Sequence, residues 1–393
     1  MKKKIIFDPN KLSLNLSVGK EKKWNLNLRN KLSSRSISRP IDRYRLEVSL
    51  ICDLRCRYCV VHMNRISRTQ KLMSKKAAEK TLKRFNKEVG KRGSLMIIGG
   101  EPLLNWDVVK YIIENCQGET MLFTNAYKLD EEKVNILSRH HTMVLTSLDG
   151  YTTKHNEDRF YPDVETRFRL ICKNIKRVSR KCRVGISCVV HQKNVDDLVP
   201  IADFFVKKLG VKSLSFAYPH FTIEKTDTNN FSMEKYTAAI CQLLKFAKKE
   251  RIYIDQIGKI LRGILYRETN VSACKICLSQ RTFYPDGTET LCTKLDTLPN
   301  YSIRKFLDIL PVNNPKCQNC VAANLCGGGC PWDAAVFPNQ IGVDKRICRH
   351  YQALVTFIIN DIESELQASK NQSEAQLIIK EKYLPLTSPS WMT

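Results

Sequence analysis

The middle of the chain alternates between short apolar runs and longer segments of helical period. Six of the runs have the length and composition of strands, and they cover residues 45–51, 94–98, 120–124, 142–147, 183–190 and 213–217. A segment of helical period separates each run from the next. This alternation predicts a parallel sheet, open or curled into part of a barrel, with the functional residues in the loops that follow the strands.

Two of the intervening segments show a helical face clearly. Ala78, Leu82, Phe85 and Val89 recur at helical spacing before Gly90 ends the segment. The later segment places on one face Val164, Phe168, Ile171, Ile175 and Val178. After residue 348, another such helix is predicted from Leu354, Phe357, Ile358 and Ile362, followed by an extended tail over residues 384–393.

Composition adds a compartment and a question about the thiols. The length of 393 residues is enough for two domains, and a hydrophobic content of 43% can supply a sizeable core. The chain includes 16 cysteines. The chain starts with Met1 and three lysines, but only three apolar residues follow before Asp8, too few for a secretion signal, and no run reaches the length of a membrane span. We therefore expect a cytoplasmic protein, in which clustered thiols bind metal.

The formal net charge is +26. Such a charge can attract nucleic acid, an anionic membrane or an acidic peptide, or it can reflect lysines on solvated helix faces. No basic stretch is interleaved with aromatic residues that could stack on bases. We expect neither a membrane nor a nucleic acid as partner. The charge then reflects either lysines on solvated helix faces or a surface that attracts an acidic peptide.

Three cysteines lie on one loop directly after the first predicted strand. Cys52, Cys56 and Cys59 have the spacing CxxxCxxC. Three thiolates can bind three irons of a four-iron, four-sulfur cluster and leave the fourth iron open to an exchangeable ligand. The alternative is a zinc site completed by His62.

The second strand ends in Gly99, Gly100, Glu101 and Pro102. Glycines at the carboxyl end of a strand allow a ligand to approach the backbone closely, although a tight turn would use them too.

Taken together, these two loops resemble those of the radical S-adenosylmethionine (SAM) superfamily, and the resemblance covers residues 45–220. It implies that the SAM amino and carboxylate groups chelate the open iron. It also implies that the segment from Gly99 to Pro102 holds the SAM amino group and that Tyr58, before the third cysteine, packs beside the adenine.

A further stretch in the same order supports the resemblance. Ser147, Asp149 and Gly150 end the fourth strand, and His155 and Arg159 follow, as in the SxDG and HxxxR elements of that family. By resemblance, the serine contacts the ribose and the arginine contacts the SAM carboxylate. Alternatively, the first residues start a turn and the arginine is a surface charge.

Eight cysteines in the last third are spaced like those of a SPASM domain, which binds two auxiliary four-iron clusters. By resemblance, the first cluster would be bound by Cys274, Cys277, Cys292 and Cys330. The second would be bound by Cys317, Cys320, Cys326 and Cys348. Two zinc knuckles are the alternative. The irregular spacing of the eight cysteines fits neither a helix nor a sheet face, so metal would supply much of the folding energy of this segment.

The remaining five thiols lie in apolar-periodic segments, and we expect them in the core. They are Cys116, Cys172, Cys182, Cys188 and Cys241.

The expected fold class is α/β, a partial (β/α)6 barrel followed by a small irregular cysteine-rich iron–sulfur domain. We expect five parts: an N-terminal extension (1–44), a radical SAM core (45–225), a helical linker (226–270), a SPASM domain (271–350), and a C-terminal helix with a tail (351–393).

The resemblance implies three [4Fe-4S] clusters and SAM as cofactors. It also implies a low-potential electron donor such as flavodoxin or ferredoxin, a 5′-deoxyadenosyl radical, and a peptide or protein substrate. In sulfatase-maturating enzymes an aspartate follows the cysteine that corresponds to Cys292, whereas Thr293 stands here. We therefore expect a ribosomally made peptide and a thioether or carbon–carbon crosslink. Anaerobic sulfatase maturation (formylglycine formation) and a non-catalytic zinc-binding protein are the alternatives.

Neither the catalytic residue nor the means of leader recognition follows from a motif. The candidates for an acid or base are Tyr284, Asp286 and Asp296. About 45 residues precede the first strand, too few for the leader-binding domain of many peptide maturases, so a separate leader-peptide-binding protein is a further expected partner.

Overall fold

Six parallel strands form the centre of the molecule, as the alternating pattern predicts. They are β4 (Arg43–Ser49), β5 (Ser94–Gly99), β6 (Glu119–Thr124), β7 (Met143–Ser147), β8 (Val184–Val189) and β9 (Ser213–Ala217). Each pairs in parallel with the next along the chain. The computed structural model describes residues 3–18, 22–28, 40–59, 70–219, 231–275, 278–297, 307, 310–311, 313–336 and 344–389.

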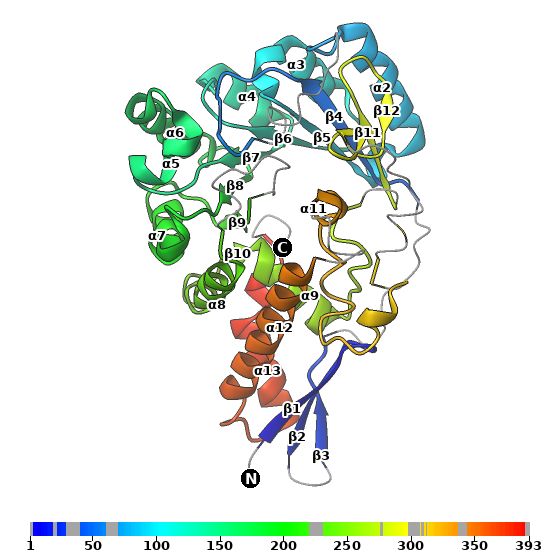
Figure 1. Cartoon of the computed structure of the whole chain (residues 1–393), viewed down its shortest axis with the longest axis vertical. Coiled ribbons are helices and arrows are strands. Elements are labelled where there is room, and N and C mark those ends of the chain that lie inside the picture. Colours follow the sequence, from blue (N-terminus) through cyan, green and yellow to red (C-terminus); the bar gives the residue numbers. More distant parts are fainter. Residues whose placement is uncertain are drawn as a thin grey trace.

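Helices cover the outer face of this sheet (Figure 1). They are α2 (Lys75–Glu88), α3 (Trp106–Asn115), α4 (Glu131–Arg139), α5 (Thr153–Phe160), α6 (Val164–Val178) and α7 (Leu198–Lys207), with the short 3₁₀ helices η1 (Gly90–Arg92), η2 (Pro102–Asn105) and η3 (Val195–Asp197). The predicted apolar faces are the buried ones. Leu82 and Phe85 of α2 are buried, as are Ile171, Ile175 and Val178 of α6.

The sheet is wider than the sequence predicts. Its order is β10-β9-β8-β7-β6-β5-β4-β11-β12, where β10 is Tyr253–Ile254, β11 is Gln280–Phe283 and β12 is Glu289–Thr290. β11 belongs to the cysteine-rich segment and pairs in parallel with β4. The predicted helical linker contains α8 (Met233–Glu250), β10 and α9 (Asp255–Tyr266).

The N-terminal extension carries a three-stranded antiparallel sheet that the sequence analysis did not predict. Its strands are β1 (Lys3–Asp8), β2 (Ser13–Val18) and β3 (Lys22–Asn25). The Asn27 amide donates to the Ile264 carbonyl of α9 at 2.7 Å, and the Asn324 amide donates to the Pro9 carbonyl at 2.6 Å. The extension therefore packs both on α9 and on the loop between Cys320 and Cys326.

The C-terminal region is helical. It contains η5 (Leu295–Thr297), η6 (Pro315–Cys317), α11 (Pro331–Val336), α12 (Lys345–Glu365), α13 (Gln372–Lys382) and η7 (Leu384–Leu386). The helix predicted after Cys348 is present as most of α12, although Phe357 is 40% exposed. The prediction of an extended tail from Leu384 is wrong at its start, because residues 384–386 form a 3₁₀ turn in which Leu386 is buried. Residues 390–393 lie outside the described part of the chain.

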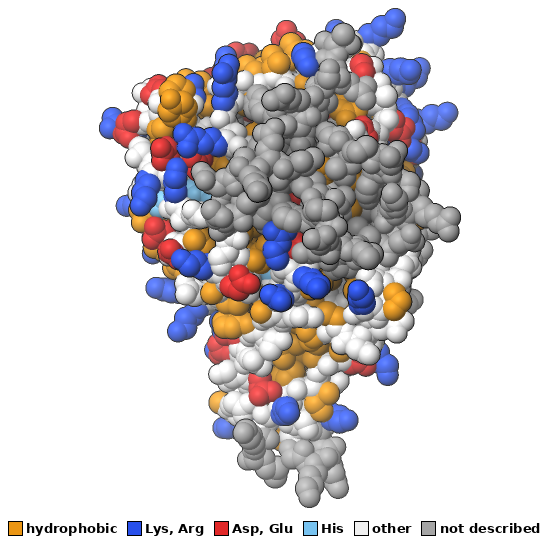
Figure 2. All heavy atoms as spheres, viewed as in Figure 1, with side chains coloured by type: hydrophobic (Ala, Val, Ile, Leu, Met, Phe, Trp, Pro, Cys, Tyr) orange, Lys and Arg blue, Asp and Glu red, His pale blue; other side chains and the backbone are white. Residues whose placement is uncertain are grey.

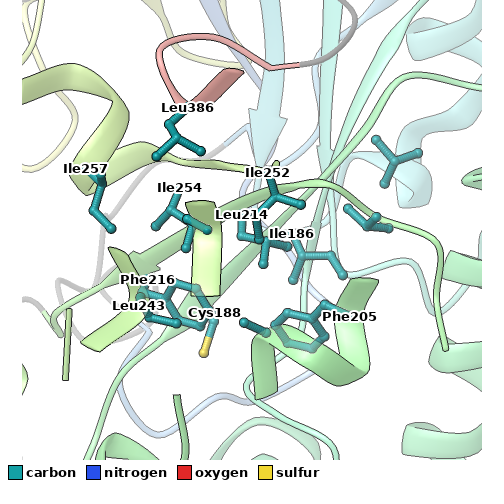
Figure 3. Packing of buried hydrophobic residues seen from close by; sticks show 14 of the residues in the cluster. Ile186, Cys188, Phe205, Leu214, Phe216, Leu243, Ile252, Ile254, Ile257 and Leu386 are labelled. Atoms are coloured by element: carbon teal, nitrogen blue, oxygen red, sulfur yellow. The ribbon is translucent and has the colours of Figure 1, made fainter. Parts of the chain in front are cut away.

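The five thiols expected in the core all pack against it. Cys188 is fully buried among apolar residues such as Phe205, Phe216 and Leu243 (Figure 3). Cys116, Cys172, Cys182 and Cys241 are partly exposed but contact the same core. Burial raises the pKa of the Cys172 thiol to about 12, so this thiol stays protonated near neutral pH.

Two observations concern the expectations on surface charge and on membrane spans. Lys and Arg side chains are spread over the face drawn in Figure 2 and do not gather in one patch there. None of the helices in the described ranges has the length and apolar character needed to cross a bilayer.

Candidate functional site

The loop with the CxxxCxxC spacing follows β4, at the carboxyl edge of the sheet. Within it, the Cys59 N–H donates to the Cys56 carbonyl at 3.0 Å, and the Leu54 N–H donates to the Cys52 sulfur at 3.4 Å. All three thiols are partly exposed. Burial raises the pKa of Cys52 to about 12 and that of Cys56 to about 11, so metal binding would have to displace their protons. His62 lies outside the described residues.

Gly99 and Gly100 bring the end of β5 against this loop. The Gly100 N–H donates to the Ser49 carbonyl at 2.7 Å, and the Glu101 N–H donates to the Ile51 carbonyl at 2.8 Å. A Cβ atom on Gly99 would lie 2.1 Å from the Ser49 oxygen, and one on Gly100 would lie 2.3 Å from the Ile51 oxygen. The glycines are therefore required for the approach of two backbones, whatever else they bind.

The Glu101 carboxylate joins two strand ends. It is fully buried and accepts hydrogen bonds from the Leu103 N–H at 3.0 Å, the Thr124 hydroxyl at 2.7 Å and the Asn125 N–H at 2.8 Å. Burial nonetheless raises its pKa to about 7. Pro102, the last residue of the motif, begins η2.

Thr124 and Asn125 were missed by the sequence analysis. The Asn125 amide donates to Asp53 at 2.8 Å and lies 3.8 Å from the Cys52 sulfur, so the end of β6 holds the cysteine loop. The other Asp53 oxygen is buried and has no hydrogen-bond partner in the described ranges. Thr124 ends the predicted strand and Asn125 directly follows it, and two polar residues at the edge that carries the cysteines were the available signal.

Asp149, Arg159 and Tyr58 contact one another below the cysteine loop. The Arg159 guanidinium donates twice to Asp149, at 3.0 and 2.9 Å, and lies 5.5 Å from the centre of the Tyr58 ring. The Tyr58 hydroxyl donates to the same carboxylate, and the Val189 N–H does so at 2.9 Å. These side chains thus tie the loop to the ends of β7 and β8. Ser147, at the end of β7, is partly exposed.

Two missed asparagines bind the backbone of Asp149, and His155 lies beside Asp197. The His155 Nε2 atom lies 3.2 Å from Asp197. The Asp149 N–H donates to the Asn156 side chain at 2.9 Å, and the Asn194 amide donates to the Asp149 carbonyl at 2.9 Å. Burial lowers the pKa of His155 despite the nearby Asp197.

Three of the four thiols predicted for the first auxiliary cluster lie together. Cys274, Cys292 and Cys330 pack in one small cluster around Trp332. Burial raises the pKa of Cys330 far above its usual value, and the nearby Asp333 and, to a smaller extent, Cys274 add to the rise. Cys277, the fourth, lies outside the described residues.

The four thiols predicted for the second cluster form a separate group. Burial, followed by the charges of Cys317, Cys320 and Cys348, raises the pKa of Cys326 to about 12. In the described part of the chain, no three thiol, imidazole or carboxylate groups are arranged to hold one metal ion. The cysteines of a four-iron cluster surround an inorganic core of several atoms, a different arrangement from ligands around one ion.

A glycine run joins the two groups. The Ala273 N–H donates to the Gly327 carbonyl at 2.8 Å, and Gly327 has a φ of +65°. A Cβ atom at Gly327 would lie 2.3 Å from the Ala273 nitrogen. The backbone before Cys274 therefore contacts the backbone after Cys326.

Of the three catalytic candidates, two hydrogen-bond to each other. The Tyr284 hydroxyl donates to Asp296 at 2.8 Å, and the Thr290 hydroxyl donates to the other Asp296 oxygen at 2.8 Å. Asp286 accepts from the Thr288 N–H at 2.8 Å within the turn between β11 and β12. All three carry contacts that stabilise this hairpin, and their catalytic role stays a prediction.

A buried carboxylate on β4 was also missed. The Glu47 carboxylate accepts a hydrogen bond from Arg45 at 3.0 Å and lies 3.4 Å from the Thr293 hydroxyl. Glu47 interrupts the apolar run of β4, and a charge at such a position was the signal in the sequence.

A cavity of about 670 Å³ lies at the opposite, amino-terminal edge of the sheet. It is lined by residues that include Arg43, Ser94, Met121, Met143 and Arg262. Among the residues that the structure describes, no predicted site residue lines this cavity, so the chemistry is assigned to the carboxyl edge, where the polar groups described above meet.

Comparison with known proteins agrees with this placement. Residues 46–205 match the family described as the Radical SAM superfamily. A cysteine-type anaerobic sulfatase-maturating enzyme of Clostridium novyi (strain NT) is 24% identical over 349 residues, which cover 77% of this chain and 91% of the relative.

Two solved structures share the fold. Native anSMEcpe with bound AdoMet and Kp18Cys peptide has a TM-score of 0.64 at 19% identity, covering 83% of this chain and 99% of that one. Streptococcus suis SuiB bound to precursor peptide SuiA has a TM-score of 0.56 at 17% identity, covering 79% and 76%.

Proposed function

Because residues 46–205 place this enzyme in the radical SAM superfamily, we propose that it modifies a ribosomally synthesised peptide, forming a thioether or carbon–carbon crosslink. Members of this superfamily bind a [4Fe-4S] cluster and SAM. When bound, these groups supply a 5′-deoxyadenosyl radical that takes a hydrogen atom from an unactivated carbon. The electron comes from a low-potential donor such as flavodoxin or ferredoxin.

The arrangement of the cysteines carries this proposal. The loop of Cys52, Cys56 and Cys59 offers three ligands, which fits a cluster with one open iron. In the proposal, Tyr58, Ser147 and Arg159 bind SAM together with the segment from Gly99 to Pro102, and Asp149 holds Arg159 in place.

Two auxiliary [4Fe-4S] clusters are the second part of the proposal. Cys274, Cys292 and Cys330 meet around Trp332, and Cys277 would complete their set. Cys317, Cys320, Cys326 and Cys348 would form the other. Full cysteine ligation leaves no iron for substrate, so these clusters would carry electrons.

A peptide substrate is supported by the two structural neighbours, whose structures contain the peptides Kp18Cys and SuiA. Sulfatase maturation remains the second candidate, because the Clostridium novyi relative bears that name. Thr293, at the position where those enzymes have an aspartate, favours the crosslinking candidate.

Anaerobic reconstitution tests both parts. We expect a brown protein with about twelve irons and twelve sulfides per chain, which forms 5′-deoxyadenosine from SAM after reduction. A colourless zinc protein that leaves SAM intact would refute the proposal. About eight irons in a fully loaded sample would refute one of the two auxiliary clusters, and about four would refute both.

Two peptides separate the candidate products. One is Kp18Cys, and the other is a synthetic copy of a short cysteine-rich or aromatic-rich precursor encoded beside the gene. A loss of 2 Da in the precursor, with a crosslink in its fragment spectrum, supports crosslinking. Conversion of the Kp18Cys cysteine to formylglycine supports sulfatase maturation instead.

A further inference from the structure

The ion pair of Arg45 and Glu47 lies on the inner face of β4. The Tyr44 ring packs on Phe85 of α2 with the ring centres 5.2 Å apart, which places Tyr44 on the outer, helix-covered face. Since successive strand residues face opposite sides, Arg45 and Glu47 face the interior of the partial barrel. Thr293 approaches Glu47 from that interior side.

This position is connected to both predicted sites of redox chemistry, to one along the chain and to the other through Thr293. Glu47 is five residues before Cys52, on the strand that leads into the cluster loop. Thr293, which contacts it, directly follows Cys292 of the first auxiliary group. A substrate that reaches from one cysteine group to the other would therefore lie beside the Glu47 carboxylate.

The ion pair is incompletely satisfied, which favours a ligand over a purely structural role. The Glu47 side chain is 2% exposed and that of Arg45 is 31% exposed. The Arg45 Nε–H is buried and has no hydrogen-bond partner among the residues that the structure describes. Buried ion pairs offset their desolvation only when the remaining donors and acceptors are bonded. A peptide carbonyl at the open Nε–H would complete the site.

We propose that Glu47 is the catalytic base that accepts the substrate proton and that Arg45 Nε binds the peptide backbone beside it. This assignment rests on the proposed function. Hydrogen-atom transfer leaves an unpaired electron on a substrate carbon. In thioether formation this carbon bonds to the sulfur of a cysteine; in formylglycine formation it forms a double bond to the sulfur that it already carries. In both cases the S–H bond breaks, and one proton and one electron leave. The proton goes to Glu47, and a four-iron cluster held by Cys292 and its neighbouring cysteines would accept the electron.

The test compares E47Q with the matched control E88Q. Glu88 also links the radical SAM core to the cysteine-rich segment, because it accepts hydrogen bonds from Arg281 of β11 at 2.7 to 3.1 Å, but it lies on α2, outside the barrel. The substrate is whichever peptide the parent enzyme modifies, synthesised with deuterium at the attacked carbon. Three quantities are measured: iron per chain, deuterium in 5′-deoxyadenosine, and modified peptide.

For E47Q we expect unchanged iron, unchanged deuterium transfer and about 100-fold less modified peptide, the scale of a lost general base. E47D should recover part of the product, and E88Q should retain it.

Equal product from E47Q, or a fall in product that only follows a fall in iron or deuterium transfer, would overturn the assignment. If E47Q does not fold, E47D decides: full iron and deuterium transfer with reduced product supports the base, and parallel losses reject it. A parent enzyme that cleaves no SAM refutes the proposed function itself.

Discussion

Replacement of Asp149 by asparagine should destabilise the protein strongly, because it leaves the buried Arg159 cation without its counter-ion. Asp149 is fully buried and the Arg159 side chain is 7% exposed. Asparagine can still accept one hydrogen bond, but its amide would face donors, and the charge pairing is lost. Breaking one side of a buried ion pair costs about 3–5 kcal/mol. With an unfolding entropy of about 2.1 cal/mol/K per residue over the whole chain, the melting temperature should fall by roughly 4–6 °C.

Differential scanning calorimetry of reconstituted D149N under anaerobic conditions measures this change. The control is D158N, because Asp158 also pairs with cations, Lys193 at 2.9 Å and Arg57 at 3.3 Å, but its side chain is 18% exposed. Partly exposed pairs contribute about 0–1 kcal/mol, so D158N should melt within about 1 °C of the parent. Equal shifts for the two variants would refute the argument that burial sets the cost.

Three further predictions concern other parts of the site. Burial raises the pKa of Glu101 from 4.5 to about 7, so the stability that its protonated form contributes is fully present below about pH 4.5 and is lost as the pH rises through 7. In urea unfolding, the free energy of unfolding of the parent should fall by about 3 kcal/mol relative to that of E101Q between pH 4.5 and 8.5. Parallel pH curves for the two proteins would contradict this. G100A should bind less iron at the first cluster, because its Cβ atom meets the Ile51 backbone oxygen at 2.3 Å, and an unchanged iron content would contradict the close-approach argument. Colorimetric analysis should find the parent's iron content in C188A and about four irons fewer per chain in C330A. Loss of iron from C188A would contradict the assignment of Cys188 as a core residue that binds no cluster.

The strands of the sheet were predictable because short apolar runs rich in β-branched residues alternate with segments of helical period. The six central strands each combine such a run with a helix after it, and the structure contains all of them. β11 has only four residues and owes its conformation to pairing with β4, so no local sequence pattern predicts this strand. In the N-terminal sheet the signal was present, since Leu12, Leu14 and Leu16 alternate with polar residues.

The cysteines and glycines of the site were predictable by type and spacing, whereas their mutual contacts were not. Asp149 and Arg159 are ten positions apart, and only the turn into α5 brings them together. Glu47 and Thr293 are 246 positions apart, and only the pairing of β11 with β4 brings them within reach. Contacts of this kind depend on topology, which a pattern of residue types does not contain.

The pairing of β11 with β4 also has a consequence for biosynthesis. The ribosome adds 230 residues between Ser49, the end of β4, and Gln280, the start of β11. At roughly 5–20 residues per second, the outer edge of β4 waits about 10–50 s for its partner. An unpaired strand edge is a template for aggregation during that time. The nascent chain therefore depends on late synthesis of its cysteine-rich segment to close the edge of a sheet that began to form much earlier.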